Sequence, residues 1–151
     1  MKLFVKQNPS FMGSGESFSV CDEHWLENFR IEAHPFSFPK RWDVCSLHGE
    51  VLAYVQRKLF SVPPKFSVCV GEDEIAVVTY KGTNYEIAGP DWRVELRDGA
   101  YQILDGERRI AAVTSQGRLL GDAYEIFIAD GEDPIKILPV ALVIDTFVGR
   151  R

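Results

Sequence analysis

Apolar and polar residues alternate in short runs along most of the chain, and turn sequences rich in Gly and Asp separate the runs. Alternation with a period of two places one set of side chains in a core and the other in solvent, which is typical of β-strands. We therefore expect about twelve strands. Their expected bounds are 2–6, 16–22, 25–32, 37–46, 50–58, 65–70, 74–80, 84–88, 91–97, 100–104, 107–115 and 121–129.

A short motif recurs at the starts of several expected strands: an aromatic residue, a polar one, a β-branched one and an apolar one. It occupies residues 18–21, 42–45 and 66–69 at a spacing of 24, and a similar pattern occupies residues 101–104 and 124–127. A longer match at an offset of 58 relates Ala53, Val55, Phe66, Val68 and Val70 to Ala111, Val113, Tyr124, Ile126 and Ile128. Strand pairs of similar length that repeat along a chain are typical of a meander or a closed barrel.

The C-terminal segment breaks this pattern, because residues 133–148 form one long apolar run. Asp133 is a suitable N-cap and Pro134 suits the first helical position. Gly149 is expected to end the helix. A strand remains an alternative because many of the residues are β-branched, but the length of the run and its cap favour a helix.

This expected helix is apolar on nearly every side, so it is either buried all round or inserted in lipid. Sixteen residues make a rod of about 24 Å, shorter than the roughly 30 Å hydrocarbon core of a membrane. Lys136 and Asp145 shorten the uncharged part further. We therefore expect no transmembrane span and predict strands that close into a barrel around a central helix.

Composition narrows the class of protein. A chain of 151 residues with 46% hydrophobic and 26% charged residues is typical of one folded domain, expected over residues 1–151. A net charge of −5 disfavours nucleic acid as a partner. Three cysteines without a C-x-x-C motif and an N-terminus without a signal peptide favour a reducing, cytoplasmic location.

Two stretches carry a resemblance to a known family. Residues 56–66, Gln-Arg-Lys-Leu-Phe-Ser-Val-Pro-Pro-Lys-Phe, resemble a hairpin of the LURP-one-related proteins, which belong to the tubby C-terminal-like group. Residues 128–133, followed by a helix with Val143-Ile144-Asp145, resemble the C-terminus of that family. The resemblance covers essentially the whole chain. It implies a mainly β fold, a twelve-stranded antiparallel tubby-like barrel that encloses a hydrophobic C-terminal helix.

The resemblance implies little about function. Tubby relatives recognise phosphoinositides, and phospholipid scramblases are thought to share the fold, whereas the LURP-one-related proteins carry no established catalytic activity. No phosphoinositide-binding residue of the tubby proteins matches a position of this chain. A shared fold without a shared site does not transfer a function.

The residues themselves offer one candidate binding site. Arg57, Lys58 and Lys65 flank an apolar, proline-containing stretch that includes Leu59 and Phe60. Bases around apolar side chains are typical of a loop that contacts the interface of an anionic membrane. The alternative is that Leu59 and Phe60 fold back into the core while the bases stay in solvent. The candidate ligand-binding residues are therefore Arg57, Lys58, Phe60 and Lys65.

Carboxylates provide two further candidates. Asp130, Glu132 and Asp133 lie close together in the sequence, as calcium ligands do, but the EF-hand spacing is absent. They are a weak calcium candidate, and the plainer interpretation is a turn followed by an N-cap. Asp145 lies on the apolar helix, where a buried carboxylate needs a partner. We expect a structural role for Asp145, with backbone groups at the barrel rim or an arginine as partners.

The histidines and cysteines show no spacing typical of metal or catalytic sites. His24, His34 and His48 stand alone and are expected at the surface. The three cysteines, Cys21, Cys45 and Cys69, occupy corresponding places in strands, so they are expected to be apolar fillers, with a redox pair as the alternative.

Together these features predict a non-enzymatic cytoplasmic binding or regulatory module without a cofactor. Anionic phospholipid or a membrane surface is the favoured partner, bound weakly. The alternatives are a protein–protein interaction scaffold and, less favoured, an enzyme with a site in the barrel mouth.

Overall fold

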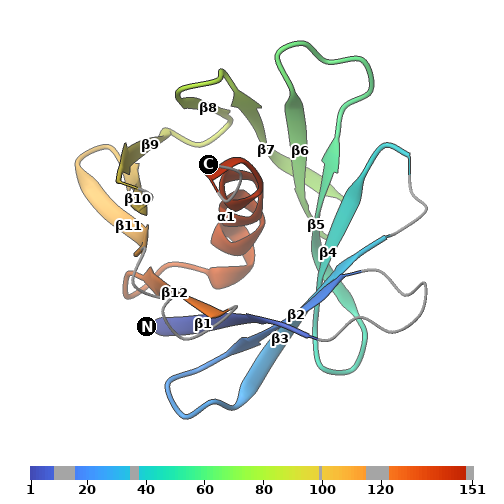
Figure 1. The fold of residues 1–151 in the computed structure, drawn as a ribbon, viewed down its shortest axis with the longest axis vertical. Coiled ribbons are helices and arrows are strands. Elements are labelled where there is room, and N and C mark those ends of the chain that lie inside the picture. The colour runs from blue at the N-terminus through green and yellow to red at the C-terminus, as the bar shows by residue number, and fades with distance from the viewer. Residues whose placement is uncertain (9–15, 35–37, 99, 115–122, 149–151) are drawn as a thin grey trace.

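Twelve strands and one helix make up the computed structural model of the chain, which describes residues 1–8, 16–34, 38–98, 100–114 and 123–148 (Figure 1). The strands are β1 (Lys2–Gln7), β2 (Ser17–Cys21), β3 (Glu27–Ala33), β4 (Arg41–Cys45), β5 (Val51–Arg57), β6 (Lys65–Val70), β7 (Asp73–Tyr80), β8 (Tyr85–Ala88), β9 (Trp92–Arg97), β10 (Ala100–Asp105), β11 (Arg108–Val113) and β12 (Ala123–Ile128). The helix is α1 (Pro134–Val148).

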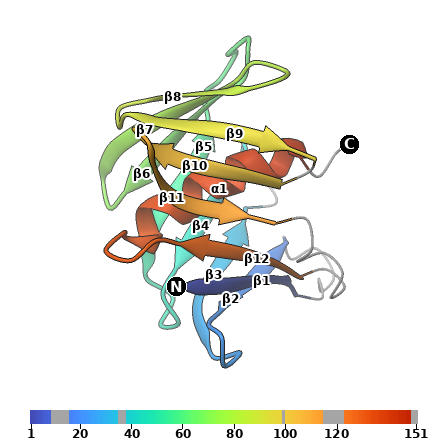
Figure 2. The ribbon, with the colours of Figure 1, turned by 90° about the vertical axis from the view of Figure 1, so that its left-hand side faces the viewer.

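The strands form one closed antiparallel barrel. Each strand pairs with its neighbours in the sequence, and β1 pairs with β12 to close the ring. The helix runs through the interior, with strands on all sides of it in both views (Figures 1 and 2). The predicted fold is therefore confirmed. The expected strand 37–46 is shorter than predicted and begins at Arg41, because Pro39 lacks the amide N–H that a strand pairing requires. Positions 37, 115, 121 and 122 of the expected strands lie outside the described residues.

The interior is filled by the helix and by alternate strand residues. Residues 137–144 of α1 are all buried, which explains why this helix is apolar on every side. Strand residues that face it, such as Leu3, Ile126 and Val55, are fully buried. The carboxylate of Asp133 accepts a hydrogen bond from the amide of Ile135 (2.9 Å), so the expected N-cap is present.

The repeated sequence motif coincides with a repeated irregularity of the barrel. The register between paired strands shifts at Val20/Cys21, Val44/Cys45, Val68/Cys69 and Ile103/Leu104, which are the last two residues of the motif in β2, β4, β6 and β10. Such β-bulges bend a strand and increase its twist, as a small closed barrel requires. The motif therefore marks four equivalent bends of the barrel wall.

The match at an offset of 58 also has a structural basis. Ala53 pairs with Val70 and Val55 with Val68 between β5 and β6. Ala111 pairs with Ile128 and Val113 with Ile126 between β11 and β12. The two strand pairs are six strands apart in the barrel, and each packs its small and branched residues inward at the same places.

Candidate functional site

The predicted basic loop forms the connection between β5 and β6, which we call the tip (residues 57–65). The hydroxyl of Ser61 donates to the carbonyl of Lys58 (2.8 Å) and accepts from the amide of Lys65 (3.0 Å). The amide of Lys58 also donates to the carbonyl of Lys65 (2.8 Å). These bonds give the tip a defined shape of its own, although it projects away from the barrel wall (Figure 1).

The apolar side chains of the tip point into solvent. Phe60 is 93% exposed, Val62 92% and Leu59 49%. The alternative in which Leu59 and Phe60 fold back into the core is therefore wrong. Phe60 also has a φ of 58°, a left-handed conformation that costs a residue with a bulky side chain about 1–2 kcal/mol. A strained turn that displays an aromatic ring in water suggests a binding role rather than a contribution to stability.

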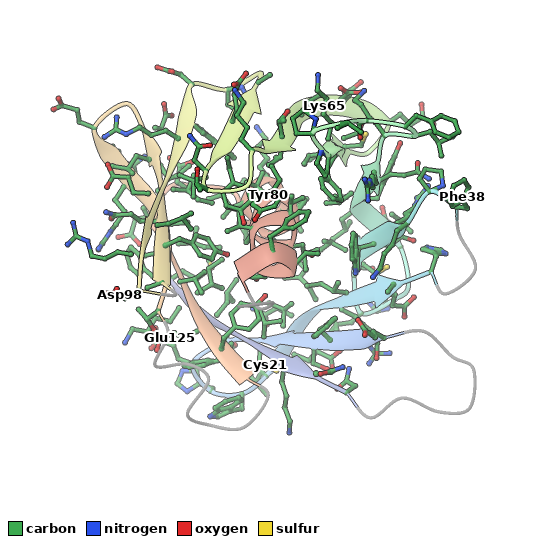
Figure 3. All side chains as sticks on the ribbon, turned by 45° about the horizontal axis from the view of Figure 1, so that its top comes forward. Cys21, Phe38, Lys65, Tyr80, Asp98 and Glu125 are labelled. Carbon is green, nitrogen blue, oxygen red and sulfur yellow. The ribbon has the colours of Figure 1, made fainter. Side chains whose placement is uncertain are left out.

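A second exposed aromatic residue lies beside the tip and was missed by the sequence analysis. Phe38, in the connection between β3 and β4, is 85% exposed. This connection is attached to β5, because the carbonyl of Lys40 accepts from the amide of Arg57 (3.1 Å). Figure 3 shows Phe38 at the edge of the barrel, on the side that carries Lys65. The order aromatic, proline, base in Phe38-Pro39-Lys40 repeats the order within the tip and was the signal available in the sequence.

The bases around these aromatic residues differ in how far they are neutralised. Lys58 lies 3.7 Å from the carboxylate of Glu74. Arg57 and Lys65 form no ion pair with any residue that the structure describes. Lys40 lies over the ring of Trp42, 4.6 Å from its centroid. At least two full positive charges therefore remain available to an anionic ligand.

Asp145 is partly buried beside a tyrosine, which was not among its expected partners. The hydroxyl of Tyr101, on β10, donates to the carboxylate of Asp145 (2.8 Å). Burial, followed by the nearby charge of Asp145, raises the pKa of Tyr101 well above its ordinary value. Tyr101 therefore stays a hydroxyl donor at neutral pH and attaches the helix to β10.

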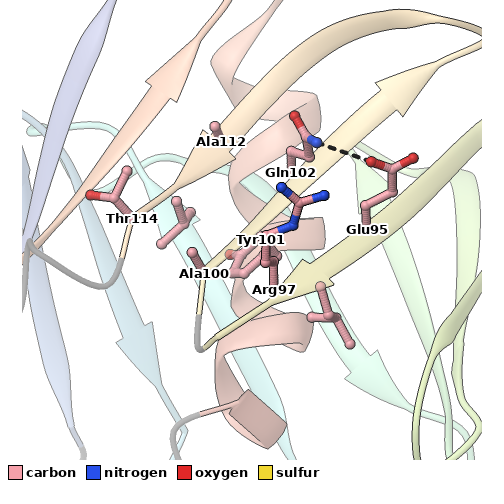
Figure 4. Close-up of a pocket in the computed structure, with 9 residues that line it drawn as sticks. Glu95, Arg97, Ala100, Tyr101, Gln102, Ala112 and Thr114 are labelled. Atoms are coloured by element: carbon pink, nitrogen blue, oxygen red, sulfur yellow. Dashed lines mark hydrogen bonds between the residues drawn. The ribbon is translucent and has the colours of Figure 1, made fainter.

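A surface hollow of about 520 Å³ borders the same tyrosine (Figure 4). Its lining comes from β9, β10 and β11 and includes Glu95, Arg97, Gln102 and Thr114. The amide of Gln102 donates to the carboxylate of Glu95 (3.0 Å). The hollow is thus lined by a guanidinium group, a carboxylate and an amide beside apolar side chains such as Leu96 and Val113.

His34 is exposed, as expected, but its ring contacts a buried carboxylate that the sequence did not indicate. Its Nε2 atom lies 2.5 Å from a carboxylate oxygen of Asp43, and Nε of Arg41 donates to the other oxygen (2.8 Å). Asp43 is only 5% exposed, and the guanidinium group of Arg41 balances its buried charge. The cluster holds the start of the β3–β4 connection against β4.

The acidic residues named as calcium candidates have other partners in the structure. Glu132 binds the guanidinium group of Arg108, and Asp130 lies 3.9 Å from the N-terminal ammonium group. Asp133 caps the helix. Within the described ranges, no group of three or more potential metal ligands is found.

The three cysteines are buried and unpaired, at the bulges of β2, β4 and β6. Burial, followed by the charges of neighbouring carboxylates, raises the pKa of the thiols of Cys21 and Cys45. A raised pKa keeps a thiol protonated and weakly reactive.

The chain matches the LURP-one-related family over residues 1–145, so it belongs to that family. It is 28% identical over 156 residues to the uncharacterised protein YxjI of Bacillus subtilis, a match that covers 96% of this chain and 92% of YxjI.

The fold is also that of a solved protein from Arabidopsis thaliana. That crystal structure matches with a TM-score of 0.67 and 13% identity, over 97% of this chain and 91% of the other. Among the described residues, no helix has the length and apolar character needed to cross a bilayer.

Proposed function

We propose that the protein is a non-enzymatic binding module that associates weakly with anionic phospholipid surfaces through its tip. The observation that carries the proposal is the exposure of Phe60 and Val62 on a turn flanked by Arg57, Lys58 and Lys65. Phe38 and Lys40, on the neighbouring connection, extend this surface with the same chemistry.

The energies favour a reversible attachment. Each base near an anionic surface contributes about 1 kcal/mol. Burial of a ring such as that of Phe60 contributes roughly 1.5–3 kcal/mol when it is complete. The net charge of −5 opposes approach of the whole protein to the surface. The electrostatic part is screened over about 10 Å at 0.1 M salt, so binding should weaken as salt is added.

Co-sedimentation with vesicles tests the proposal. The protein is incubated at low salt with vesicles of phosphatidylcholine alone or mixed with phosphatidylserine. We expect more protein to sediment with the mixed vesicles, and the difference to disappear at high salt.

Two triple variants sharpen the test. Arg57→Glu, Lys58→Glu and Lys65→Glu together should remove the preference for anionic vesicles without changing the melting temperature by more than a few degrees. The matched control reverses Lys6, Arg109 and Lys136, which are exposed bases without ion pairs among the described residues. Both variants lower the net charge equally, so only a local role of the tip separates them. If the wild-type protein ignores anionic vesicles at low salt, the proposal fails and the interaction-scaffold alternative takes its place.

A further inference from the structure

The pairing between β8 and β9 is short, and we call the boundary between these two strands the seam. β9 pairs with β10 through all six of its residues, but it pairs with β8 only through Arg93 and Glu86. Beyond that pair the two strands diverge toward the end of the barrel where α1 ends (Figure 2). Residues 94–97 therefore form an edge of the sheet inside an otherwise closed barrel.

The direction of the backbone groups along this edge follows from the register. Arg97 pairs with Ala100 and Glu95 with Gln102 across the β9–β10 hairpin. In an antiparallel pair, residues that exchange hydrogen bonds alternate with residues whose amides point the other way. The closing pair of a tight hairpin exchanges hydrogen bonds, so the amides of Arg97 and Glu95 point to β10. The amide and carbonyl of Leu96 then point to the seam, where no strand pairs with them among the described residues.

The side chains of this edge alternate between the core and the outer face of the barrel. Val94 and Leu96 face the core and are half-buried. Glu95 and Arg97 lie on the outer face, where Glu95 is engaged by Gln102 (3.0 Å) and Arg93 (3.4 Å). Arg97 forms no ion pair with any described residue and borders the hollow shown in Figure 4.

We propose that the β9 edge binds an extended peptide segment of another protein, in which apolar residues alternate with acidic ones. The segment would pair its backbone with Leu96 and cover Val94 and Leu96 with its apolar side chains. An acidic side chain on the other face would meet Arg97. This mode of recognition takes affinity from main-chain hydrogen bonds and specificity from alternate side chains.

The shape of the seam favours a single strand over a second barrel. Because β8 meets β9 again at Glu86 and Arg93, the open part is a wedge. A strand that pairs with β9 lies about 4.8 Å from it and extends about 13 Å along four residues. A second copy would have to bring its own β7–β8 hairpin into the same wedge.

Amide hydrogen exchange measured by NMR on the full chain provides the test. The probe is a synthetic eight-residue peptide of alternating valine and aspartate, blocked at both ends. In the free protein, the Leu96 amide should exchange at least tenfold faster than those of Glu95 and Arg97. Saturating peptide should slow the Leu96 amide at least tenfold and leave the other two unchanged.

Variants and a second peptide control for unspecific binding. Arg97→Glu should weaken peptide binding at least fivefold, whereas Arg109→Glu, on the outer face of β11, should leave it unchanged. A peptide that alternates valine with lysine should bind at least fivefold more weakly.

Three results would overturn the proposal: slow exchange of Leu96 in the free protein, no protection by the peptide, or protection that arises from dimerisation seen by analytical ultracentrifugation. None of these results bears on membrane binding by the tip, so the two proposals fail independently.

Discussion

The tip and the seam both leave interaction groups exposed, and they do so in opposite ways. The tip is shaped by hydrogen bonds between Lys58, Ser61 and Lys65 and exposes side chains, among them Phe60 at 93%. The seam keeps its apolar side chains half-buried and exposes backbone, at Leu96. A surface made of side chains suits a lipid interface, whereas a surface made of backbone suits another strand.

The contacts between the helix and the barrel wall also differ between the two regions. On the side of the tip, α1 packs against β4, β5 and β6. Beside the seam, tyrosines on the flanking strands bind the helix through their hydroxyls: Tyr85 of β8 donates to the carbonyl of Ile144 (3.2 Å), and Tyr101 of β10 to that of Ala141 (3.3 Å) and to Asp145. Apolar packing supports the strands that carry the tip, while the polar contacts attach β8 and β10, the strands on either side of β9, to the helix.

Removal of the helix should abolish both regions together and is the largest expected effect. A chain that ends after Gly131 loses seven apolar side chains that are at most 8% exposed, from Ile137 to Ile144. At roughly 1.5–3 kcal/mol each, these side chains contribute about 10–20 kcal/mol, which is comparable to the whole 5–15 kcal/mol by which a domain is stable. Thermal unfolding followed by circular dichroism should show no cooperative transition. A truncated protein that still unfolds cooperatively would show that the helix is an appendage.

A glycine in the connection between β8 and β9 should be sensitive to substitution because it lies close to β7. Gly89 has a φ of 113°, and a Cβ placed there would lie 2.5 Å from the carbonyl oxygen of Ile75. Gly89→Ala should therefore destabilise the protein by about 2–4 kcal/mol, through backbone strain and displacement of β7.

The matched control for this variant is Gly71→Ala, because Gly71 has a φ of 61° and no atom lies within 4 Å of its Cβ position. Urea denaturation should show a loss of only about 1 kcal/mol for this control. Equal losses for the two variants would contradict the close approach of Gly89 to Ile75.

Loss of one hydroxyl should weaken the attachment of β10 to the helix and leave the tip unchanged. Tyr101→Phe removes the donor to Asp145 and should destabilise the protein by about 1.5–3 kcal/mol at neutral pH.

The effect should depend on pH. The pKa of Tyr101 is raised above its ordinary value of 10.0 in the folded protein, so the folded state favours the protonated phenol. The stability that depends on this phenol is fully present below pH 10 and is lost as the pH rises further. The difference in unfolding free energy between wild type and Tyr101→Phe should therefore shrink above pH 10. A difference that is constant with pH would contradict this assignment.

A glycine at the tip should separate binding from stability and is the smallest expected effect. Phe60→Gly relieves the left-handed strain but adds flexibility to the unfolded chain, so stability should rise by at most about 1 kcal/mol. Vesicle binding should fall because the inserted ring is lost. A clear loss of stability would show instead that Phe60 supports the fold.

The fold was largely predictable from the sequence because its signals are local. Alternation identified the strands, and Asp133 followed by Pro134 identified the start of the helix. The repeated aromatic, polar, β-branched motif was visible, but its meaning was not, because a bulge is a property of two paired strands. The partner of Asp145 was missed for the same reason, since Tyr101 is 44 residues away in the sequence.

The two candidate surfaces also differ in whether a local sequence signal reveals them. The bases and aromatic residues of the tip are contiguous, so composition alone pointed to Arg57, Lys58, Phe60 and Lys65. The edge of β9 carries no compositional signal, because Trp92–Arg97 alternates like any paired strand. Only the register shows that β8, which begins at Tyr85, does not extend far enough to cover this edge.

A spin label at the tip tests membrane association most directly. Val62→Cys places the label at a side chain that is 92% exposed, and Leu47→Cys places the control at one that is 55% exposed in the β4–β5 turn. The native cysteines are buried, so the introduced thiol should react selectively. On anionic vesicles at low salt, the label at position 62 should gain accessibility to oxygen and lose accessibility to an aqueous nickel chelate, while the label at position 47 should change little. A label at position 62 that stays equally accessible to the nickel chelate would contradict insertion of the tip.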